Sequence, residues 1–480
     1  SEKNDTLIGD FNANVLRGGN GHDTLEGLLG ADTLDGGDGN DTASYEHAVA
    51  GVTVNLTDNS KNGGADAVGD TLISIENVTG SAFDDSLTGN TNANTLRGGD
   101  GNDTLIGKGG ADLLDGGGGN DTASFAGSAI KVTASLTTSF TDGDPVAQTG
   151  DAAGVVYTDI ENLTGSDYDD TLIGDIGNNI INGGKGNNTL EGMGGADTFV
   201  GNVDTDTVTY NHASAGVLAS LTTTFTAGPA VIQTGDAAGD SFTSIENLTG
   251  STYADTLIGD SRDNVLRGGL GGDTLEGMGG ADTLIGSVSG NDTASYAHAT
   301  SYVRASLTTG LSGFVAEGHA GGDVYTSIEN LTGSGFNDIL IGDSGVNVIQ
   351  SGAGDDVLEG MNGADALDGG TGNNTASYEH ATGVGGIGVT ADLGNVANNL
   401  GDAAAGDTYT NIQNLAGSAY NDILVGDAAN NILSGGAGND TLSGLGGTDT
   451  LYGGDGNDDL TDDGAGAAIM DGGAGDDTIR

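Results

Sequence analysis

The stretch from Gly18 to Ser44 reads GGNGHDTLE, GLLGADTLD and GGDGNDTAS, which are three consecutive rows of nine residues. Each row has glycine at its first and fourth places, aspartate at the sixth, and leucine or alanine at the eighth. The same register returns from Gly98 to Ser124 and again from Gly435. Because self-similarity at a fixed period is the signature of stacked-repeat architectures, the sequence predicts a single repetitive fold.

A longer period contains the short one. The segments IENVTG and IENLTG place glutamate at 76, 161, 246 and 329, and the related IQNLAG places glutamine at 413. Each long module holds several nine-residue rows, followed by a remainder that fits the row pattern poorly. We expect all modules to form one continuous solenoid. The modules cover residues 1–79, 80–164, 165–249, 250–332, 333–416 and 417–480, of which the first and last are partial.

A nine-residue row has a direct structural interpretation. Glycine at places one and four allows positive φ angles and close backbone approach in a tight turn. The residues after the aspartate form a short strand whose middle side chain points inward. Two rows make one coil of eighteen residues, and coils stack as parallel strands about 4.7 Å apart. The pattern predicts an elongated all-β fold, a parallel β-roll or β-solenoid. The inward leucines are Leu25, Leu34, Leu105, Leu114, Leu190, Leu275, Leu284, Leu358, Leu442 and Leu451.

Composition excludes several classes of protein. The chain has 70 acidic residues against 11 Lys and Arg, giving a formal net charge of −59. That charge argues against nucleic acid or an anionic membrane surface as a partner. There is no cysteine, so disulfides and thiolate metal sites are excluded. No apolar run is long enough for a transmembrane segment, and the N-terminus does not resemble a secretory signal.

The sixth-place aspartates predict a cation site. Stacked coils bring these carboxylates close together, where like charges repel. A hard divalent cation between turns would remove the repulsion. Calcium fits best, because it accepts six to eight oxygen ligands from carboxylates and backbone carbonyls in tolerant geometry. Magnesium prefers a strict octahedron, and zinc prefers His or Cys.

In its nine-residue rows the chain resembles the repeats-in-toxin (RTX) calcium-binding proteins, whose nonapeptide is GGxGxDxUx. The resemblance implies a β-roll holding multiple Ca²⁺ ions between turns one coil apart, type I secretion, and folding outside the cell. Carried over by position, the carboxylate ligands are Asp23, Asp32, Asp41, Asp103, Asp112, Asp121, Asp197, Asp273, Asp282, Asp365, Asp440, Asp449, Asp458 and Asp477. Glycines of the same turns, expected to offer carbonyl oxygens, are Gly18, Gly36, Gly98, Gly116, Gly435 and Gly453.

Some rows depart from the pattern. Asn188 and Asn374 stand where aspartate is expected, the row of Asp206 lacks its second glycine, and the row of Asp292 carries one extra residue. We expect weak or absent binding in these rows. The chain begins and ends inside a repeat, and we expect it to be part of something longer or a unit that stacks end to end.

Three other recurring features have a functional and a structural interpretation. The motif Tyr-x-His-Ala could bind a transition metal or supply a base, but its recurrence without a second nearby histidine favours a structural corner. The Asn-x-Thr sequons could be glycosylated, although a hydrogen-bonded asparagine ladder fits their fixed place better. Outward threonines could bind ice or a polysaccharide, and β-propensity on an exposed face explains them more simply. These residues are His47, His212, His298 and His380; Asn77, Asn162, Asn247 and Asn330; and Thr24, Thr33, Thr104, Thr274, Thr283 and Thr441.

No catalytic constellation emerges from the sequence, and we do not expect an enzyme. The favoured interpretation is an extracellular, calcium-binding structural protein, such as a surface-layer, adhesin or matrix rod, that folds when Ca²⁺ binds. The alternative is the repeat tail of a secreted protease, lipase or polysaccharide-modifying enzyme. End-to-end self-association is a further prediction, because no polar capping repeat is evident. A cell-surface polysaccharide is a possible partner.

Overall fold

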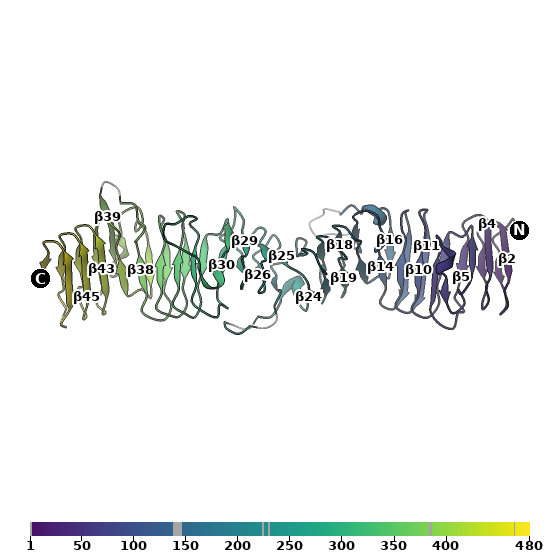
Figure 1. Ribbon diagram of the computed structural model, residues 1–480, viewed down its shortest axis with the longest axis horizontal. Coiled ribbons are helices and arrows are strands. Elements are labelled where there is room, and N and C mark those ends of the chain that lie inside the picture. Colours follow the sequence, from purple (N-terminus) through teal and green to yellow (C-terminus); the bar gives the residue numbers. More distant parts are fainter. Residues whose placement is uncertain (1, 138–145, 223–224, 229–230, 384–385, 465) are drawn as a thin grey trace. The chain divides into compact units, whose positions relative to one another are not determined.

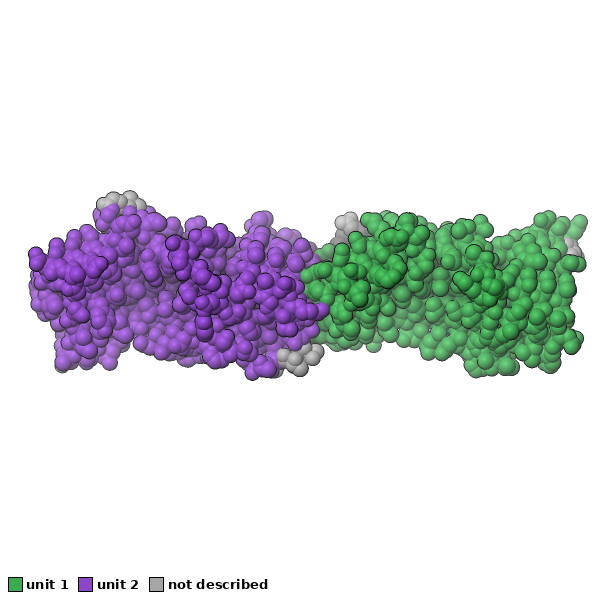
Figure 2. Space-filling model, in the orientation of Figure 1, with its two compact units in different colours: residues 1–217, 233–247 green, residues 218–232, 248–480 purple. Residues whose placement is uncertain are grey.

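The computed structural model describes residues 2–137, 146–222, 225–228, 231–383, 386–464 and 466–480. The chain forms two compact units, one of residues 1–217 and 233–247 and the other of residues 218–232 and 248–480 (Figure 2). The described parts of both units consist of short strands and turns, with no α-helix. The all-β prediction is therefore confirmed. No helix in these ranges is long and apolar enough to cross a membrane.

The first unit contains three complete sheets and part of a fourth. The seven-stranded sheet is β1 (Thr6–Ile8), β3 (Thr24–Glu26), β5 (Thr42–Ser44), β9 (Asn77–Thr79), β11 (Thr95–Asp100), β13 (Leu113–Gly118) and β16 (Val156–Thr158). The three-stranded sheet is β2 (Val15–Asn20), β4 (Thr33–Asp38) and β8 (Thr71–Ile73). The nine-stranded sheet is β24 (Ser241–Thr243), β21 (Thr198–Val200), β19 (Ile180–Asn182), β17 (Asn162–Thr164), β14 (Thr122–Ser124), β12 (Thr104–Ile106), β10 (Ser86–Thr88), β6 (Val52–Asn55) and β7 (Gly63–Gly64). The fourth set is β15 (Thr133–Ser135), β18 (Thr171–Ile173), β20 (Thr189–Glu191) and β22 (Thr207–Thr209).

The second unit repeats this plan. One sheet is β23 (Leu218–Ser220), β26 (Thr256–Ile258), β28 (Thr274–Glu276), β30 (Thr293–Ser295), β33 (Asn330–Thr332), β35 (Val348–Gln350), β37 (Ala366–Asp368) and β40 (Thr408–Thr410). Another is β31 (Arg304–Ser306), β34 (Ile339–Ile341), β36 (Val357–Glu359), β38 (Thr375–Ser377), β41 (Asn414–Ala416), β43 (Ile432–Ala437), β45 (Thr450–Asp455) and β47 (Ile469–Ala474). The remainder is β27 (Val265–Arg267), β29 (Thr283–Ile285) and β32 (Val324–Thr326), and β39 (Ile387–Asp392), β42 (Asn421–Val425), β44 (Thr441–Ser443), β46 (Asp459–Thr461) and β48 (Thr478–Ile479). Strand β25 (Asn247–Thr249) lies where the chain passes between the units, and the 3₁₀ turns are η1 (Asn59–Lys61), η2 (Gly150–Ala152), η3 (Gly235–Ala237), η4 (Gly318–Ala320) and η5 (Val396–Asn398).

Strands within a row block pair in parallel with partners eighteen residues away. Leu7 pairs with Leu25 between β1 and β3, and Leu25 pairs with Ala43 between β3 and β5. The intervening rows pair on a second sheet, where Leu16 of β2 faces Leu34 of β4. Two rows therefore form one coil, and the prediction of a parallel β-roll is confirmed.

The core is a column of eighth-place side chains between the two sheets. All ten leucines predicted to point inward are fully buried, as Leu25 and Leu105 illustrate. Tight stacking of the turns explains the fourth-place glycines. A Cβ built on Gly39 would lie 1.6 Å from the carbonyl oxygen of Gly21 in the preceding coil, so no larger residue fits there without backbone movement.

The poorly matching remainder of each module is an insertion that replaces one sheet with another. In residues 45–76, β8 pairs with β4 and ends the three-stranded sheet, whereas β6 pairs with β10 and begins the nine-stranded sheet. On the other sheet, β5 pairs directly with β9, which continues to β11. One sheet is thus interrupted while the other passes the insertion unbroken. The strands of this unit can be followed from β2 to β14 in Figure 1.

Candidate metal centre

The sixth-place aspartates form a ladder along the turns. Each carboxylate accepts a hydrogen bond from a backbone N–H in the preceding coil. The N–H of Asp23 donates to Oδ1 of Asp41 at 2.7 Å, and that of Asp103 donates to Oδ1 of Asp121 at 2.7 Å. The N–H of Asp440 donates to Oδ1 of Asp458 at 2.8 Å. Aspartates eighteen residues apart are therefore neighbours across one coil.

The second carboxylate oxygen distinguishes most of these residues. In fifteen sixth-place aspartates Oδ2 is buried without a hydrogen-bond partner in the described part of the chain. Burying an acceptor without a donor costs free energy, and burying an unpaired charge costs more. A cation bound beside each of these oxygens would remove that cost. The aspartates are Asp23, Asp32, Asp41, Asp103, Asp112, Asp121, Asp197, Asp206, Asp273, Asp282, Asp356, Asp365, Asp440, Asp449 and Asp458.

We call the rows of these aspartates open rows. The set contains every carboxylate expected from the sequence except Asp477, which is partly exposed and accepts the N–H of Asp458 at 3.0 Å. It also contains Asp206 and Asp356, which the sequence template did not select. The row of Asp356 starts with serine in place of the first glycine, and the row of Asp206 lacks the fourth-place glycine.

Backbone carbonyls lie on the same side as the unpartnered oxygens. A Cβ built on Gly18 would lie 2.2 Å from Oδ2 of Asp23 and 2.7 Å from the carbonyl oxygen of Gly36. On Gly98 the corresponding distances are 2.0 Å to Asp103 and 2.6 Å to the Gly116 carbonyl. A Cβ on Gly435 would lie 2.6 Å from the carbonyl oxygen of Gly453. The first-place glycine thus keeps open the space beside a carboxylate and a carbonyl oxygen.

This donor set fits calcium. It consists of carboxylate and carbonyl oxygens, which are the ligands that Ca²⁺ prefers. Within the described residues no three side chains of His, Cys, Asp or Glu converge on one point, so an ion here would complete its shell with backbone oxygens or water. Calcium tolerates such a mixed shell, whereas zinc sites are built from converging side chains.

Electrostatics agree with the hydrogen-bond accounting. Burial raises the pKa of Asp103 to about 7, although the N–H of Asp85 stabilises its charged form, and the Asp85 and Asp121 carboxylates add to the increase. Burial also raises the pKa of Asp197 and of Asp365 to about 7. Without a cation, these carboxylates are poorly stabilised in their charged form.

All open rows share one backbone angle. The residue at the second place has a positive φ, for example 108° at Gly19, 61° at Leu28 and 89° at Asn202. The rows of Asn188, Asn374 and Asp477 share this angle, whereas the serine rows that follow the IEN segments do not. Non-glycine residues pay a steric cost for this conformation, and such strain concentrates at ligand sites. Asn202 has this angle in the row of Asp206, so this row keeps the backbone of the open rows at its second place although it lacks the fourth-place glycine.

Closed rows satisfy the sixth-place side chain internally. The N–H of Ser166 donates to Oδ2 of Asp170 at 2.5 Å, its hydroxyl donates to Oδ1 at 2.9 Å, and the N–H of Val132 donates to Oδ1 at 2.6 Å. The row that follows each IEN segment has this serine. The corresponding pairs are Ser81 with Asp85, Ser251 with Asp255, Ser334 with Asp338, and Ser418 with Asp422.

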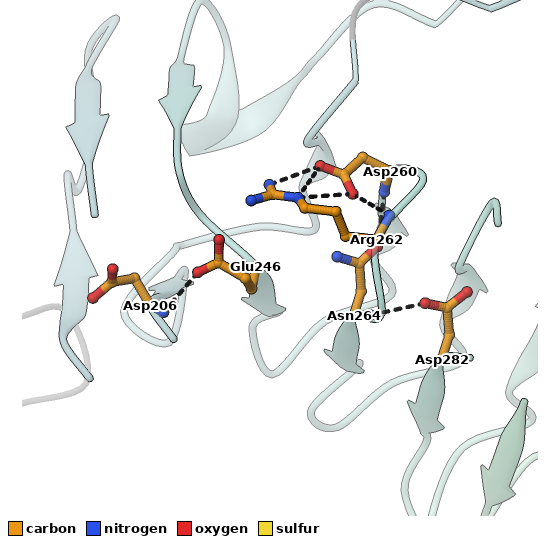
Figure 3. Close-up of polar contacts among 6 residues, drawn as sticks. All are labelled: Asp206, Glu246, Asp260, Arg262, Asn264 and Asp282. Atoms are coloured by element: carbon orange, nitrogen blue, oxygen red, sulfur yellow. Dashed lines mark hydrogen bonds and ion pairs between the residues drawn. The ribbon is translucent and has the colours of Figure 1, made fainter. Parts of the chain in front are cut away.

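The next row of each module has asparagine at the sixth place. The N–H of Asp260 donates to Oδ1 of Asn264 at 2.8 Å, and the N–H of Asn264 donates to Oδ1 of Asp282 at 2.8 Å (Figure 3). In the equivalent row, Nδ2 of Asn94 donates to the carbonyl oxygen of Glu76 at 2.8 Å. An amide therefore supplies internally the donor that an aspartate lacks.

The Tyr-x-His-Ala motif forms a corner at the start of each insertion. The hydroxyl of Tyr45 donates to Asp70 at 3.1 Å, and Nδ1 of His47 lies 2.9 Å from Glu26, whose hydrogen bond raises the pKa of the imidazole. The second module has different residues at all four of these positions. It has Phe125 for the tyrosine, Val155 for the aspartate, Gly127 for the histidine and Ile106 for the glutamate. Joint replacement of both pairs fits the structural interpretation.

The asparagines of the IEN segments lie in the ladder. Nδ2 of Asn77 donates to Oδ1 of Asn40 at 2.8 Å, and its own Oδ1 accepts the N–H of Thr95 at 3.0 Å. Asn162 makes the equivalent bond to Asn120 at 2.9 Å. Asn77 is buried, which suits the ladder interpretation better than glycosylation.

Comparison with protein families gives one result. The model of the RTX calcium-binding nonapeptide repeat matches more than half of the chain, and a comparison with curated proteins gave no match. The matched segments are residues 1–25, 8–43, 74–105, 88–123, 157–190, 173–208, 249–284, 326–349, 341–376, 411–442 and 425–460. RTX repeats bind calcium, and so many copies imply several ions. The chain therefore belongs to the family of RTX calcium-binding repeat proteins.

Proposed function

We propose that this protein is an extracellular structural component that folds when calcium binds. The observation that carries the proposal is the set of fifteen buried carboxylate oxygens without hydrogen-bond donors. A net charge of −59 adds general repulsion to these local costs. Because the ions bind the folded turns and neutralise them, the free energy of calcium binding becomes free energy of folding.

The cellular setting follows from the same coupling. RTX repeats are typical of secreted proteins. A chain that stays unfolded where calcium is scarce suits type I export, and it would fold outside the cell where calcium is abundant. The row blocks recur along the 480 residues, and on that regularity we favour a surface-layer, adhesin or matrix role. The alternative is the repeat tail of a secreted enzyme, and a catalytic domain in the sequence that flanks these residues would decide for it.

Two partners remain predictions. Threonines pair along the outside of the roll, as Thr6, Thr24 and Thr42 do between β1, β3 and β5, and this regular surface suits a cell-surface polysaccharide. End-to-end self-association would give a filament or layer. Light scattering across a range of protein and calcium concentrations tests it, and a monomer at every concentration would exclude it.

The main test measures folding against calcium. We expect circular dichroism at neutral pH to lose its β signal in excess EDTA and to recover it in calcium, with little recovery in magnesium at the same concentration. A spectrum that does not change when the metal is removed would overturn the proposal.

A further inference from the structure

The last row before each insertion contacts a side chain of the insertion. Inside a row block, the N–H of Asp103 donates to Oδ1 of Asp121, eighteen residues further along the chain. In the last row the N–H of the sixth-place aspartate donates instead to the glutamate of the IEN segment. The N–H of Asp121 donates to Oε2 of Glu161 at 2.7 Å, and that of Asp41 donates to Oε2 of Glu76 at 2.9 Å. The glutamate thus takes the place of a sixth-place aspartate in the following coil.

The third instance is drawn in Figure 3, where the N–H of Asp206 donates to Oε2 of Glu246 at 3.0 Å. In each pair one glutamate oxygen is used by the ladder, and the glutamate carries a second oxygen. The aspartate also keeps its buried, unpartnered Oδ2. Two carboxylates therefore meet at one turn.

A strained turn brings a carbonyl oxygen to the same place. Two residues before the glutamate, the backbone is left-handed, with φ of 49° at Ser74, 46° at Asp159 and 52° at Ser244. A Cβ built on Gly116 would lie 2.0 Å from the carbonyl oxygen of Asp159 and 2.5 Å from Oδ2 of Asp121. Both are acceptors, so neither can satisfy the other by a hydrogen bond.

The same two distances recur at the other two turns. A Cβ on Gly36 would lie 2.2 Å from the Ser74 carbonyl oxygen and 2.6 Å from Oδ2 of Asp41. A Cβ on Gly201 would lie 2.1 Å from the Ser244 carbonyl oxygen and 2.3 Å from Oδ2 of Asp206. A left-handed, strained residue at each of these turns is explained if its carbonyl oxygen is a metal ligand, because backbone strain concentrates at ligand sites.

The fifth module solves the same problem with amides. It has Asn374 and Gln413 in place of the aspartate and the glutamate, and the N–H of Asn374 donates to Oε1 of Gln413 at 2.8 Å. Nδ2 of Asn374 donates to the carbonyl oxygen of Asn411, the left-handed residue of this turn, at 3.0 Å and to that of Gly369 at 2.7 Å. In the first three modules the Oδ2 of the equivalent aspartate has no such donor in the described residues.

The fourth module uses a backbone donor instead. The N–H of Asp292 donates to Glu329 at 2.8 Å, but the N–H of Ser287 donates to Oδ2 of Asp292 at 2.6 Å. That aspartate oxygen is therefore satisfied without an ion. Two modules thus provide their own donors for the sixth-place side chain, whereas in the other three the Oδ2 of Asp41, Asp121 or Asp206 has none in the described residues.

We propose that the glutamate of the IEN segment is a calcium ligand in the first three modules. Asp41 with Glu76, Asp121 with Glu161, and Asp206 with Glu246 each bind one Ca²⁺, together with the carbonyl oxygen of the left-handed residue. This proposal rests on the proposed calcium-dependent fold. The ion joins the end of a row block to the end of its insertion, so calcium also fixes the inserted segment onto the roll.

The test counts bound calcium in paired variants. Glu161→Gln is compared with Glu329→Gln, its matched control in the fourth module. Bound calcium per chain is measured by mass spectrometry of the metal at fixed free calcium, and circular dichroism checks the fold. We expect E161Q to lose one ion, or to bind it at least tenfold more weakly, and E329Q to keep the wild-type count.

A gain of binding provides the second arm. The double variant N374D/Q413E should gain one ion, whereas N374D alone should gain none at the same calcium concentration. The inference is overturned if E161Q binds like E329Q, or if N374D alone gains the full ion. Wild-type protein that binds no calcium would instead overturn the proposed function, so the two failures are distinguishable.

Discussion

Protonation of the buried carboxylates should stabilise the metal-free fold in part, as calcium binding does. The number of buried carboxylates and their pKa values determine how large this stabilisation is. Burial raises the pKa of eight open-row aspartates from 3.8 to about 6 or 7 in the metal-free fold. Between the unfolded and folded pKa values the folded state binds more protons, so its stability rises as the pH falls. The residues are Asp103, Asp112, Asp197, Asp206, Asp273, Asp282, Asp365 and Asp440.

The magnitude decides whether the metal-free chain folds at neutral pH. A carboxylate with such a pKa destabilises the folded state at high pH by up to ~4 kcal/mol, and solvent screening reduces this to about a quarter of that value. At ~1 kcal/mol each, eight groups contribute about 8 kcal/mol, comparable with the whole stability of a typical domain. We therefore expect metal-free protein to be unfolded near pH 8 and to regain β structure as the pH falls towards 5.

The assay is circular dichroism of protein stripped of metal by chelating resin, titrated from pH 8 to pH 5. A parallel titration in saturating calcium is the control, and it should change little because the ions already neutralise the carboxylates. Calcium binding near pH 6.5 should also release protons, which calorimetry in buffers of different ionisation enthalpy detects. A metal-free spectrum that is the same at both ends of the titration would refute the reasoning.

Three further changes test individual positions. Asp103→Asn should reduce the number of bound calcium ions, whereas Asp170→Asn in a closed row should leave it unchanged; equal losses in metal analysis would argue against the distinction between the rows. Gly39→Ala should lower the thermal midpoint in calcium, because its Cβ would collide with the Gly21 carbonyl at 1.6 Å, and an unchanged midpoint would contradict this close packing. Leu105→Ala should lower the free energy of unfolding by ~2–5 kcal/mol, measured by denaturant unfolding in saturating calcium, because the side chain is fully buried. A loss well below this range would show that the leucine contributes little to the core.

The repeat pattern predicts the roll because its signals are local. Glycine spacing defines the turn, and the leucine after the aspartate defines the inward side, so the eighteen-residue coil and the burial of Leu25 and Leu105 follow from the pattern. The insertions are less predictable. Their strands β6 and β8 pair with rows from different blocks, and nothing in a short window of sequence specifies those partners.

The sequence template selects most of the aspartates whose Oδ2 lacks a donor. It does not select Asp206 and Asp356, because each of their rows lacks one of the two template glycines, although the second-place residue has the positive φ that all open rows share. Asn202 reaches that angle at φ of 89°. The role of Glu76 is hidden for another reason, since its equivalence to a ladder aspartate appears only when the insertion brings distant segments together.

The staggered sheets have a mechanical consequence. At the insertion of residues 45–76 one sheet ends and another begins, whereas the opposite sheet continues without a break through β5, β9 and β11. No cross-section within that unit separates two modules without also cutting a continuous sheet. Under tension, we expect this unit to unfold in segments longer than a single sequence module. The spacing between force peaks in a single-molecule pulling experiment would measure the length of these segments.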